Sequence, residues 1–488
     1  MSTNPTKPIL QGLIALVLSL SLVACETKTT QSQTPSAPTT TISDSSVSLS
    51  DLDRELLPLV SELQLTGDPS QGRTYPPAQD SLVQLGKQLF FQPYKAQGAS
   101  FSCAQCHDPL QGGTLRQPLA TGLAQTDNSR EVVPDYLFHR GRSVVPARNA
   151  PTTFNMSLWD VMMFHDGRVQ ALKPNKGANG STGGISTPNT SVAEPDPQAG
   201  RNLVQAAAQL TLLRSSLILQ KASSNEASLP NPYTLSIDQH LDREQQRFSL
   251  DANLWLSRFR QGFNTPDGLP LTLVTHDKIA EALAAYMRSQ VFINNPWKHY
   301  LEGDPNAISE TAKQGALLFF RNPQQGGFGC ARCHSGDTFT DENLYRTLIP
   351  TLHLKHPLRA LPDELDYGRW FITREDKDKF SFRTPSLLNV TETGPWGHNG
   401  AYVTLSAMVR HMLDPVAEAS QYDATQLTEA ALAADHLVQG INTMLFQGID
   451  LTSQKYSQKE LQALLAFLHT LTDPCIKDPV CLKPWLPD

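Results

Sequence analysis

The stretches Cys103-Ala-Gln-Cys106-His107 and Cys330-Ala-Arg-Cys333-His334 repeat one pattern within a chain of 488 residues. In C-x-x-C-H, two thiols form thioethers with the vinyl groups of a haem, and the adjacent histidine binds the iron. A zinc site would need four ligands in one cluster, whereas each pair has only its own histidine. A redox dithiol would normally stand in a βαβ context, which is not evident here. The two stretches therefore predict two covalently bound haem c groups.

Three shorter patterns recur in the same order around both motifs. They are G-x-x-L-F-F before the cysteines, then a segment from Arg to Asn that contains Pro, and finally H-[DN]-G. They stand at 86–91, 148–155 and 165–167 in the first unit, and at 315–320, 383–389 and 398–400 in the second. The haem histidine and the H-[DN]-G histidine are 58 and 64 residues apart, which is typical of a duplicated one-haem module.

The hydrophobic periodicity predicts a mainly α fold of two tandem cytochrome c-like helical domains, with loop-rich insertions. Apolar residues spaced three and four apart predict four helices, at 82–91, 277–290, 312–321 and 457–471, the last opening with a capping box. The first domain is expected at 51–295 and the second at 296–488. Residues 171–200, rich in Gly, Asn, Ser, Thr and Pro, predict a long surface insertion.

The N-terminus has the features of an export signal. An apolar run at 9–24 follows a single positive residue, Lys7, and is too short for a comfortable membrane span. It ends in Leu-Val-Ala before Cys25, which resembles the lipobox of bacterial lipoproteins, where cleavage precedes a cysteine that receives lipid. Residues 1–24 are thus predicted as the signal peptide and 25–50, poor in large apolar residues, as a flexible tether. We expect a periplasmic protein whose only membrane contact is this lipid; an ordinary cleaved signal is the alternative.

Composition excludes several classes of protein. The chain has 40 Lys and Arg against 47 Asp and Glu, so it lacks the basic excess that nucleic-acid binding usually requires. A mean hydropathy of -0.31 does not fit a multipass membrane protein. Cys475 and Cys481 have no neighbouring histidine, and in an exported protein they favour a local disulfide.

Taken together, the haem motifs, the repeated Arg and Asn segments and H-[DN]-G resemble the bacterial dihaem cytochrome c peroxidase family, which includes the MauG enzymes. The resemblance covers roughly residues 76–474. It implies an oxidoreductase of the cytochrome-c peroxidase type, in which the second haem accepts electrons from a small cytochrome c or cupredoxin and the first reduces hydrogen peroxide. It is compatible with a homodimer. The alternatives are a non-enzymatic electron-transfer cytochrome and MauG-like oxidation of a protein or organic substrate.

The resemblance assigns a second ligand to each iron. Met412, fourteen residues after the H-[DN]-G histidine, matches the methionine that binds the second iron; a thioether opposite imidazole raises the potential. The adjacent His411 competes for that role, and helix packing is the plain alternative for Met412. His139 lies twelve residues before Pro151, near the place of a loop histidine that binds the first iron in the resting family enzyme. It could equally be a surface residue, with the first haem open.

A replacement between the two haems concerns catalysis. Family members carry a tryptophan in F-W-D-G-R, where this chain has His165 between Phe164 and Asp166. Imidazole conducts through hydrogen bonds or moves protons near neutral pH, but it is harder to oxidise to a radical than indole. His165 and His139 are therefore the candidate catalytic residues, with a structural role for His165 as the alternative.

The resemblance also implies a calcium ion, held by the Asn149 side chain and the carbonyl oxygens of Thr393 and Pro395, with waters completing the shell. Oxygen ligands suit calcium. The alternative is that Asn149 caps a turn.

One family feature is missing. A glutamate that lies over the peroxide-reacting haem has no counterpart, because there is no acidic residue between Pro197 and Asn225. Peroxide cleavage needs a group that moves a proton, which typically gives a ~10²–10⁴-fold rate gain. Glu194, Asp196 and Glu226 lie nearby in sequence, but no pattern places them at the iron. The sequence therefore predicts slow peroxidase turnover.

Overall fold

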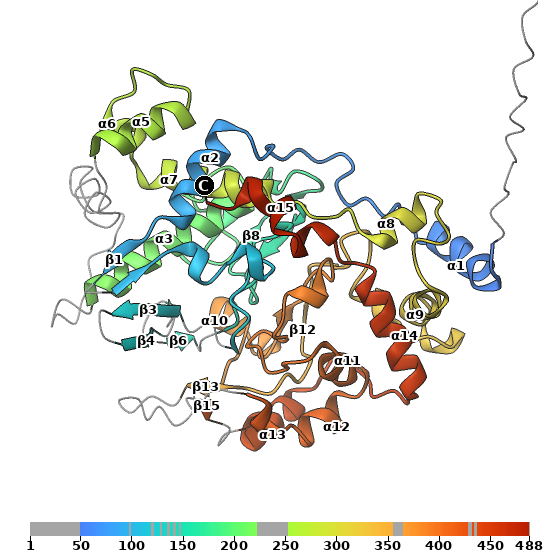
Figure 1. The fold of residues 1–488 in the computed structure, drawn as a ribbon. Helices are drawn as coiled ribbons and strands as arrows, with labels where there is room; N and C mark the ends of the chain where they lie inside the picture. The colour runs from blue at the N-terminus through green and yellow to red at the C-terminus, as the bar shows by residue number, and fades with distance from the viewer. Residues whose placement is uncertain are drawn as a thin grey trace, which may run out of the picture. The chain divides into compact units, whose positions relative to one another are not determined.

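The computed structural model describes residues 49–96, 99–118, 122–126, 129–133, 137–139, 143–145, 148–221, 252–354, 365–427, 432–433 and 437–487 (Figure 1). The helices are α1 (Asp51–Glu62), α2 (Ser81–Phe91), α3 (Leu203–Lys221), α5 (Ala252–Gly262), α6 (Pro270–Leu273), α7 (His276–Ser289), α8 (Pro296–Leu301), α9 (Glu310–Phe320), α10 (Trp370–Thr373), α11 (Leu405–Leu413), α12 (Pro415–Ser420), α13 (Leu437–Gln447), α14 (Gln458–His469) and α15 (Pro479–Leu482). The four helices predicted from periodicity are confirmed as α2, α7, α9 and α14.

The strands are short, from two to five residues. They are β1 (Tyr94–Ala96), β2 (Ala99–Phe101), β3 (Gly122–Thr126), β4 (Ser129–Val133), β5 (Leu137–His139), β6 (Ser143–Val145), β7 (Met162–Met163), β8 (Val169–Ala171), β9 (Pro174–Asn175), β10 (Gly180–Ser181), β11 (Ile185–Ser186), β12 (Leu344–Tyr345), β13 (His353–Leu354), β14 (Phe382–Arg383) and β15 (Leu432–Ala433). β1–β4 form one antiparallel sheet, β7, β8 and β11 another, and the rest pair in twos. The mainly α class predicted from the sequence agrees with this helix-rich arrangement.

The sequence repeat corresponds to a repeated helix pair. α2 packs against α7, and α9 packs against α14. A Cβ atom on Gly86 would come within 1.9 Å of the carbonyl oxygen of Ala282, and one on Gly315 would come equally close to that of Ala463. No side chain can occupy such a position, so the glycine of G-x-x-L-F-F allows the two backbones to approach in each pair. Each cysteine motif comes after the first helix of a pair in the chain.

The N-terminal helix α1 precedes the first haem motif but packs against α9 of the second pair. Its Asp53 is buried there, with Oδ1 2.8 Å from the Nζ atom of Lys313, and it accepts a 2.9 Å hydrogen bond from the Tyr300 hydroxyl. The same carboxylate completes the capping box with Ser50 at the start of α1. The domain boundaries 51–295 and 296–488 remain a proposal. Helix α1 belongs to the first domain by sequence but packs in the core of the second.

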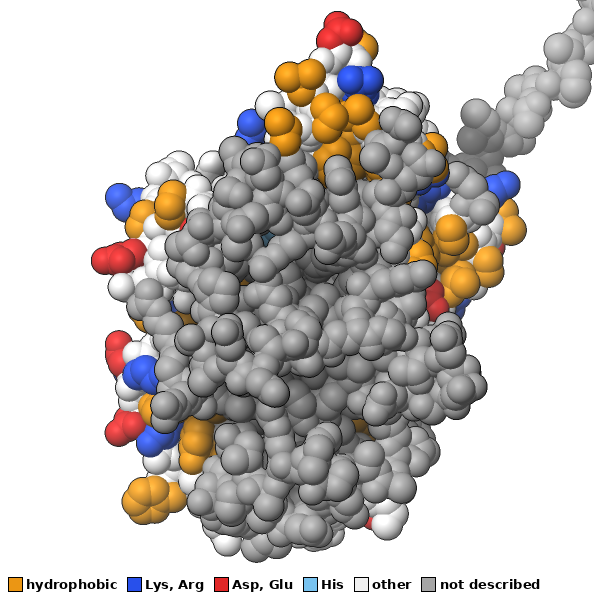
Figure 2. Space-filling model, turned by 90° about the vertical axis from the view of Figure 1, so that its left-hand side faces the viewer, with side chains coloured by type: hydrophobic (Ala, Val, Ile, Leu, Met, Phe, Trp, Pro, Cys, Tyr) orange, Lys and Arg blue, Asp and Glu red, His pale blue; other side chains and the backbone are white. Residues whose placement is uncertain are grey.

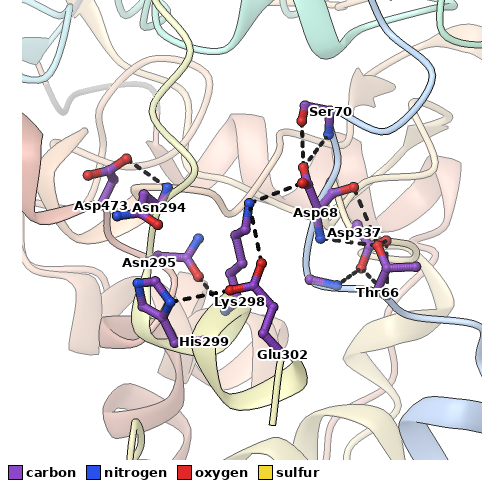
Figure 3. Close-up of polar contacts among 11 residues, drawn as sticks. Thr66, Asp68, Ser70, Asn294, Asn295, Lys298, His299, Glu302, Asp337 and Asp473 are labelled. Atoms are coloured by element: carbon purple, nitrogen blue, oxygen red, sulfur yellow. Dashed lines mark hydrogen bonds and ion pairs between the residues drawn. The ribbon is translucent and has the colours of Figure 1, made fainter. Parts of the chain in front are cut away.

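The segment after α1 is attached to the loop that follows the second haem motif (Figure 3). The carboxylate of Asp337, three residues after His334, accepts hydrogen bonds from the backbone nitrogens of Thr66 at 3.0 Å and Gly67 at 2.8 Å. Asp68 in turn lies 3.0 Å from the Nζ atom of Lys298 on α8. These contacts hold residues 66–68 beside the second haem loop.

The C-terminal segment returns to the first helix pair. The structure contains a disulfide between Cys475 and Cys481, the pairing that the sequence analysis prefers. Helix α15, which contains Cys481, contacts the turn Pro109–Gln111, just after the first haem motif. The hydroxyl of Tyr286 on α7 donates a 2.7 Å hydrogen bond to the carbonyl oxygen of Trp485. The two ends of the described chain therefore each pack in the half that is distant in sequence.

Residues 171–200 differ from a purely exposed insertion. Most are partly or fully exposed, but Ile185 and Ala199 are buried in a core cluster with α3, and Asp196 is buried beside them in sequence. The segment is thus a folded loop that contributes to the first core.

Exposed apolar side chains gather on α5, α6 and the turn between them, with Leu269 62% exposed. They form part of the orange surface at the top of Figure 2. Within the described part of the chain, none of the helices combines the length and hydropathy that a bilayer span requires.

Candidate functional site

The first haem motif lies in a short 3-10 turn after α2 and β2. The Nδ1 atom of His107 lies 3.0 Å from the carbonyl oxygen of Pro151 and 3.4 Å from that of Gly113. A carbonyl can only accept, so Nδ1 carries the hydrogen and Nε2 is the nitrogen available to a metal. Burial lowers the pKa of His107 and favours the neutral ring that iron ligation needs.

The second motif shows the same arrangement. The Nδ1 atom of His334 lies 3.1 Å from the carbonyl oxygen of Phe339, and the ring also hydrogen-bonds the backbone of Pro385. Pro151 and Pro385 occupy matching places in the repeated Arg and Asn segments. Those segments therefore orient the haem histidine in each unit, which explains why they recur with the cysteine motif.

The four motif cysteines are not joined in disulfides. Burial raises the pKa of Cys330 to about 12, so its sulfur is a neutral thiol at physiological pH. Zinc binding and dithiol exchange both use the thiolate, and a thiol whose pKa is raised is less suited to either. Haem attachment, in which the sulfur becomes a neutral thioether, fits this environment.

A cavity of about 330 Å³ lies at the second motif. It is lined by Cys330, Cys333 and His334 on one side and by Met408 and Met412 of α11 on another. The two methionines are one helical turn apart, so they share a face of α11. The structure thus brings Met412 and His334 to one cavity, as a haem ligand pair requires.

His411 is already engaged elsewhere. It is fully buried, with Nδ1 2.7 Å from the hydroxyl of Tyr402 and Nε2 2.7 Å from the carbonyl oxygen of Thr347. Because both ring nitrogens have partners, neither can bind iron without breaking a buried hydrogen bond. The geometry favours Met412 over His411 as the ligand of the second iron.

Arg383 offers a positive charge to the same cavity. Its Nη1 atom is buried without a hydrogen-bond partner, and its Nε atom donates a 3.0 Å bond to the carbonyl oxygen of Phe164. Burial lowers its pKa to about 9, although Glu342 and Asp166 oppose that effect. A buried guanidinium with an unused donor matches the carboxylates of a haem, which are anions. Arg383 is therefore suited to hold a haem propionate.

His165, a candidate catalytic residue from the sequence, also lines this cavity. Its Nε2 atom lies 2.9 Å from the carbonyl oxygen of Asn149, which makes Nε2 the protonated nitrogen. Burial lowers the pKa of His165 to about 4, and the positive charges of Arg148 and Arg383 act in the same direction. The ring is neutral at physiological pH and a weak base.

Beside it, His398 of the second H-[DN]-G stacks on Phe382 with 3.6 Å between ring centroids. Burial lowers the pKa of His398 to about 3, so it is also neutral. The nearby charge is carried by Arg148, whose guanidinium binds both oxygens of Asp366 at 2.7 Å and one oxygen of Asp166 at 2.7 Å. This buried cluster joins segments from both halves of the sequence.

The predicted calcium ligands lie close together. The amide nitrogen of Asn149 donates a 2.7 Å hydrogen bond to the carbonyl oxygen of Pro395, while its Oδ1 atom is buried without a partner. Thr393 lies two residues away and lines the same cavity. Turning the amide would place two uncharged oxygens side by side, and a cation suits that donor set. Among the described residues, no cluster of three His, Cys, Asp or Glu side chains could hold a metal ion.

Neither of the described acidic residues near the first domain's insertion that the sequence offers for the first haem lines the cavity. His139 ends β5, but its side chain lies outside the described part, as does Glu226. Glu194 is exposed. Asp196 is buried, and its carboxylate accepts hydrogen bonds from Thr187 and Asn189. Neither Glu194 nor Asp196 lines the cavity.

Comparison with known proteins finds a family model and several relatives that match this chain. A family model described as "Di-haem cytochrome c peroxidase" matches residues 80–306. Cytochrome-c peroxidase IdrP2 of Denitromonas iodatirespirans is 25% identical over 424 residues, which cover 83% of this chain and 85% of the relative. Methylamine utilization protein MauG of Methylorubrum extorquens is 24% identical over 389 residues, covering 80% and 77%. These matches support the dihaem cytochrome c peroxidase and MauG family for this chain.

A solved structure has a similar fold. The diheme peroxidase BthA from Burkholderia thailandensis E264 aligns with a TM-score of 0.51 and 20% sequence identity, covering 83% of this chain and 89% of that one. The names of the curated relatives support a peroxidase-like oxidoreductase that carries haem c.

Sequence reasoning missed three residues of the site. Asp366 is distant from Arg148 in sequence and belongs to no motif. Tyr402 is recognised only through its contact with His411. Trp159 lines the cavity and lies six residues before His165. Its closeness to the position where the family tryptophan is replaced could have drawn attention to it.

Proposed function

We propose that this protein reduces hydrogen peroxide at a first haem bound by Cys103, Cys106 and His107. Electrons would come from a small cytochrome c or cupredoxin and enter at a second haem bound by Cys330, Cys333 and His334. Each peroxide takes up two electrons and two protons and yields two water molecules. The bound haem irons supply this redox chemistry, and the protein supplies their ligands, orientation and surroundings.

The observation that carries the proposal is the hydrogen bond from Nδ1 to a backbone carbonyl in both haem histidines. It leaves Nε2 as the nitrogen for iron twice, at two motifs that each provide two thiols. Met412 would complete the second iron and Arg383 would bind a haem carboxylate. The thioether favours the reduced state, which suits a site that accepts and stores electrons.

Proton transfer at the first haem has no distal glutamate to assist it in this chain. We retain His165 and His139 as its candidates, with His165 acting as a neutral imidazole. General acid–base groups work best with a pKa near the working pH, and the low pKa of His165 makes it an inefficient proton carrier. Turnover is therefore expected to be slower than in a peroxidase with a distal carboxylate.

We further propose that calcium binds at Asn149, Thr393 and Pro395, and that the protein is tethered in the periplasm through lipid on Cys25. The orphan Oδ1 atom of Asn149 supports the calcium site. Isothermal titration of the chelator-treated holoprotein with calcium tests it, with Asn149→Ala as the variant expected to lose the binding.

Peroxide consumption by the reduced, haem-loaded protein tests the main proposal. Pyridine haemochrome analysis must first return two haems per chain, falling to one in C103A/C106A and in C330A/C333A. Peroxide-dependent oxidation of the second haem would support a peroxidase. Two intact haems that stay reduced in peroxide would instead identify an electron carrier. Oxidation of a partner protein or organic substrate in preference to the donor would indicate a MauG-like reaction.

A further inference from the structure

The disulfide between Cys475 and Cys481 closes a short loop that lies against the turn after the first haem motif. The loop contains the turn Pro474–Lys477 and most of α15. Both parts contact the turn Pro109–Gln111, which begins two residues after His107. A disulfide-closed segment from the C-terminus therefore touches the stretch of chain that carries the first haem histidine.

Two buried side chains anchor this loop. Each cysteine is followed by a buried apolar residue, Ile476 in the turn and Leu482 in α15. Both belong to one apolar cluster with Phe154. Phe154 lies three residues after Pro151, whose carbonyl oxygen is 3.0 Å from the Nδ1 atom of His107. The disulfide thus fixes the spacing of two side chains that support the segment orienting the first haem histidine.

The chain beyond the disulfide is attached to the core of the first helix pair, and it ends beside α2 and α7 (Figure 1). The indole nitrogen of Trp485 donates a 3.0 Å hydrogen bond to the hydroxyl oxygen of Ser289. Its carbonyl oxygen accepts the bond from Tyr286. Trp485 and Cys103 both pack against the core cluster of α2 and α7. The tail thus shares the core beside which the haem motif begins, in addition to contacting the turn that follows the motif.

An ion pair ties the same loop to the second half of the sequence. The Nζ atom of Lys477 lies 2.6 Å from one carboxylate oxygen of Glu392, and the other oxygen lies 3.3 Å from Arg116, after the first haem motif. Ion pairs as exposed as these contribute little stability. We therefore expect the buried side chains and the disulfide to hold the loop in place.

The disulfide is open to reagents from outside. Cys481 is exposed, Cys475 is partly buried, and Val480, next to Cys481, is 80% exposed. Exposed disulfides exchange with external thiols more readily than buried ones. The cysteines of the haem motifs, once joined to haem as thioethers, cannot take part in such an exchange.

We propose that Cys475 and Cys481 form a redox modification site, which a dithiol reduces and whose opening weakens the support of His107. The inference rests on the proposed function, because it presumes haem at the first motif. The dithiol gives two electrons and two protons. The bond between the two Sγ atoms breaks, two thiols form, and the dithiol becomes a disulfide. The haem irons take no part in this exchange.

Opening the loop should act on the first haem alone. Ile476 and Leu482 would no longer be held at one spacing, so the carbonyl oxygen of Pro151 would be less firmly placed against His107. The hydrogen bond at Nδ1 makes an iron-bound imidazole a stronger donor, which favours ferric iron. Its loosening should therefore raise the midpoint potential of the first haem. The second haem, whose histidine bonds to Phe339, should keep its potential.

The test compares the closed and open forms of the haem-loaded full chain. Dithiothreitol opens the disulfide, iodoacetamide blocks the two thiols, and redox titration monitored by absorbance gives the midpoint potential of each haem. C475S/C481S is open without reagents, and the reagents should not change it further. Chemical opening does not depend on whether this variant folds. Leu482→Ala and Val480→Ala are a matched pair on α15, because one side chain is buried and the other is exposed.

We expect dithiothreitol to open the disulfide without loss of haem. The potential of the first haem should rise in the opened protein and in C475S/C481S, and by a smaller amount in L482A, while V480A should match the parent protein. Peroxide consumption should fall about tenfold on opening, the lower end of the effect of disturbing a partner of a metal-bound histidine.

Three results would overturn the inference: a disulfide that resists dithiothreitol in the folded protein, an unchanged potential of the first haem, or equal shifts of both haems. Equal shifts would mean that the whole molecule loosens. If no form of the protein consumes peroxide, the proposed function fails, whereas the comparison of potentials still tests this site.

Discussion

The hydroxyl of Tyr402 lies 2.7 Å from the Nδ1 atom of His411, and both side chains are buried. With Nε2 bound to Thr347, this contact fixes one side of α11 to the neighbouring loop. The next residue, Met412, is thereby held on the face that borders the haem cavity. The residue that competes with Met412 in the sequence is thus the one that orients it in the structure.

Tyr402→Phe should loosen this arrangement. The variant leaves Nδ1 of buried His411 without a partner, which costs about 1–3 kcal/mol in the free energy of unfolding. The near-infrared band of thioether-ligated ferric haem should weaken, because Met412 is less firmly held. Tyr422→Phe is the control, since Tyr422 packs on Tyr402 but donates its hydroxyl to Ala401. An equal effect of both variants on that band would contradict the assignment.

Met412→Leu should abolish the thioether band and lower the midpoint potential of the second haem, because the sulfur that favours ferrous iron is lost. The volume change is small, so the fold should tolerate it at a cost under about 1.5 kcal/mol. Met408→Leu, one turn earlier on the same face, should leave the band in place. Redox titration monitored by absorbance separates the two variants, and loss of the band in M408L would reassign the ligand.

Asp53→Asn should destabilise the attachment of α1. It removes one partner of the buried pair with Lys313, a change that typically costs about 3–5 kcal/mol. The effect should depend on pH. Burial alone would raise the pKa of Asp53, but the hydrogen bonds from Lys313, Ser50 and Tyr300 outweigh it and the pKa is lowered.

A lowered folded-state pKa gives stability that is present above the unfolded value, about 3.9, and is lost as the pH falls through the folded value. The difference between D53N and the parent protein in denaturant unfolding should therefore be large at neutral pH and shrink below about pH 4. Asp51→Asn, on the exposed side of α1, should change little. A pH-independent difference would rule out the charge of Asp53 as the cause.

Gly86→Ala and Gly315→Ala should each separate one helix pair. The added methyl group would meet a backbone oxygen that cannot move aside, and overpacking typically costs about 1–3 kcal/mol or more. If the two cores unfold separately, each variant should shift only one calorimetric transition. A single transition shifted equally by both would show that the cores unfold together.

Several parts of the molecule could be predicted from local sequence. The helices α2, α7, α9 and α14 follow from hydrophobic periodicity, and the capping box of Ser457 and Glu460 marks the start of α14. The cysteine motifs predict the haem positions because covalent attachment needs adjacent residues. These features depend on spacing within a few residues, which a single sequence displays.

Long-range contacts could not be predicted in this way. The pairs Arg148 with Asp366 and Asp53 with Lys313 join residues far apart in the chain, and no local pattern identifies either partner. Trp159 was missed because a motif comparison considers one fixed position, whereas a cavity accepts an indole from any segment that borders it. The place of Met412 was predictable, but the reason that His411 is excluded depends on Tyr402 and Thr347.

The exchange of chain ends has a consequence for any attempt to divide the molecule. A cut after residue 295 would leave the C-terminal fragment without α1 and the N-terminal fragment without the tail that carries Trp485. Each fragment would expose a surface that the other normally covers. An isolated half could therefore be stable only if it also included the chain end from the other half that packs on it.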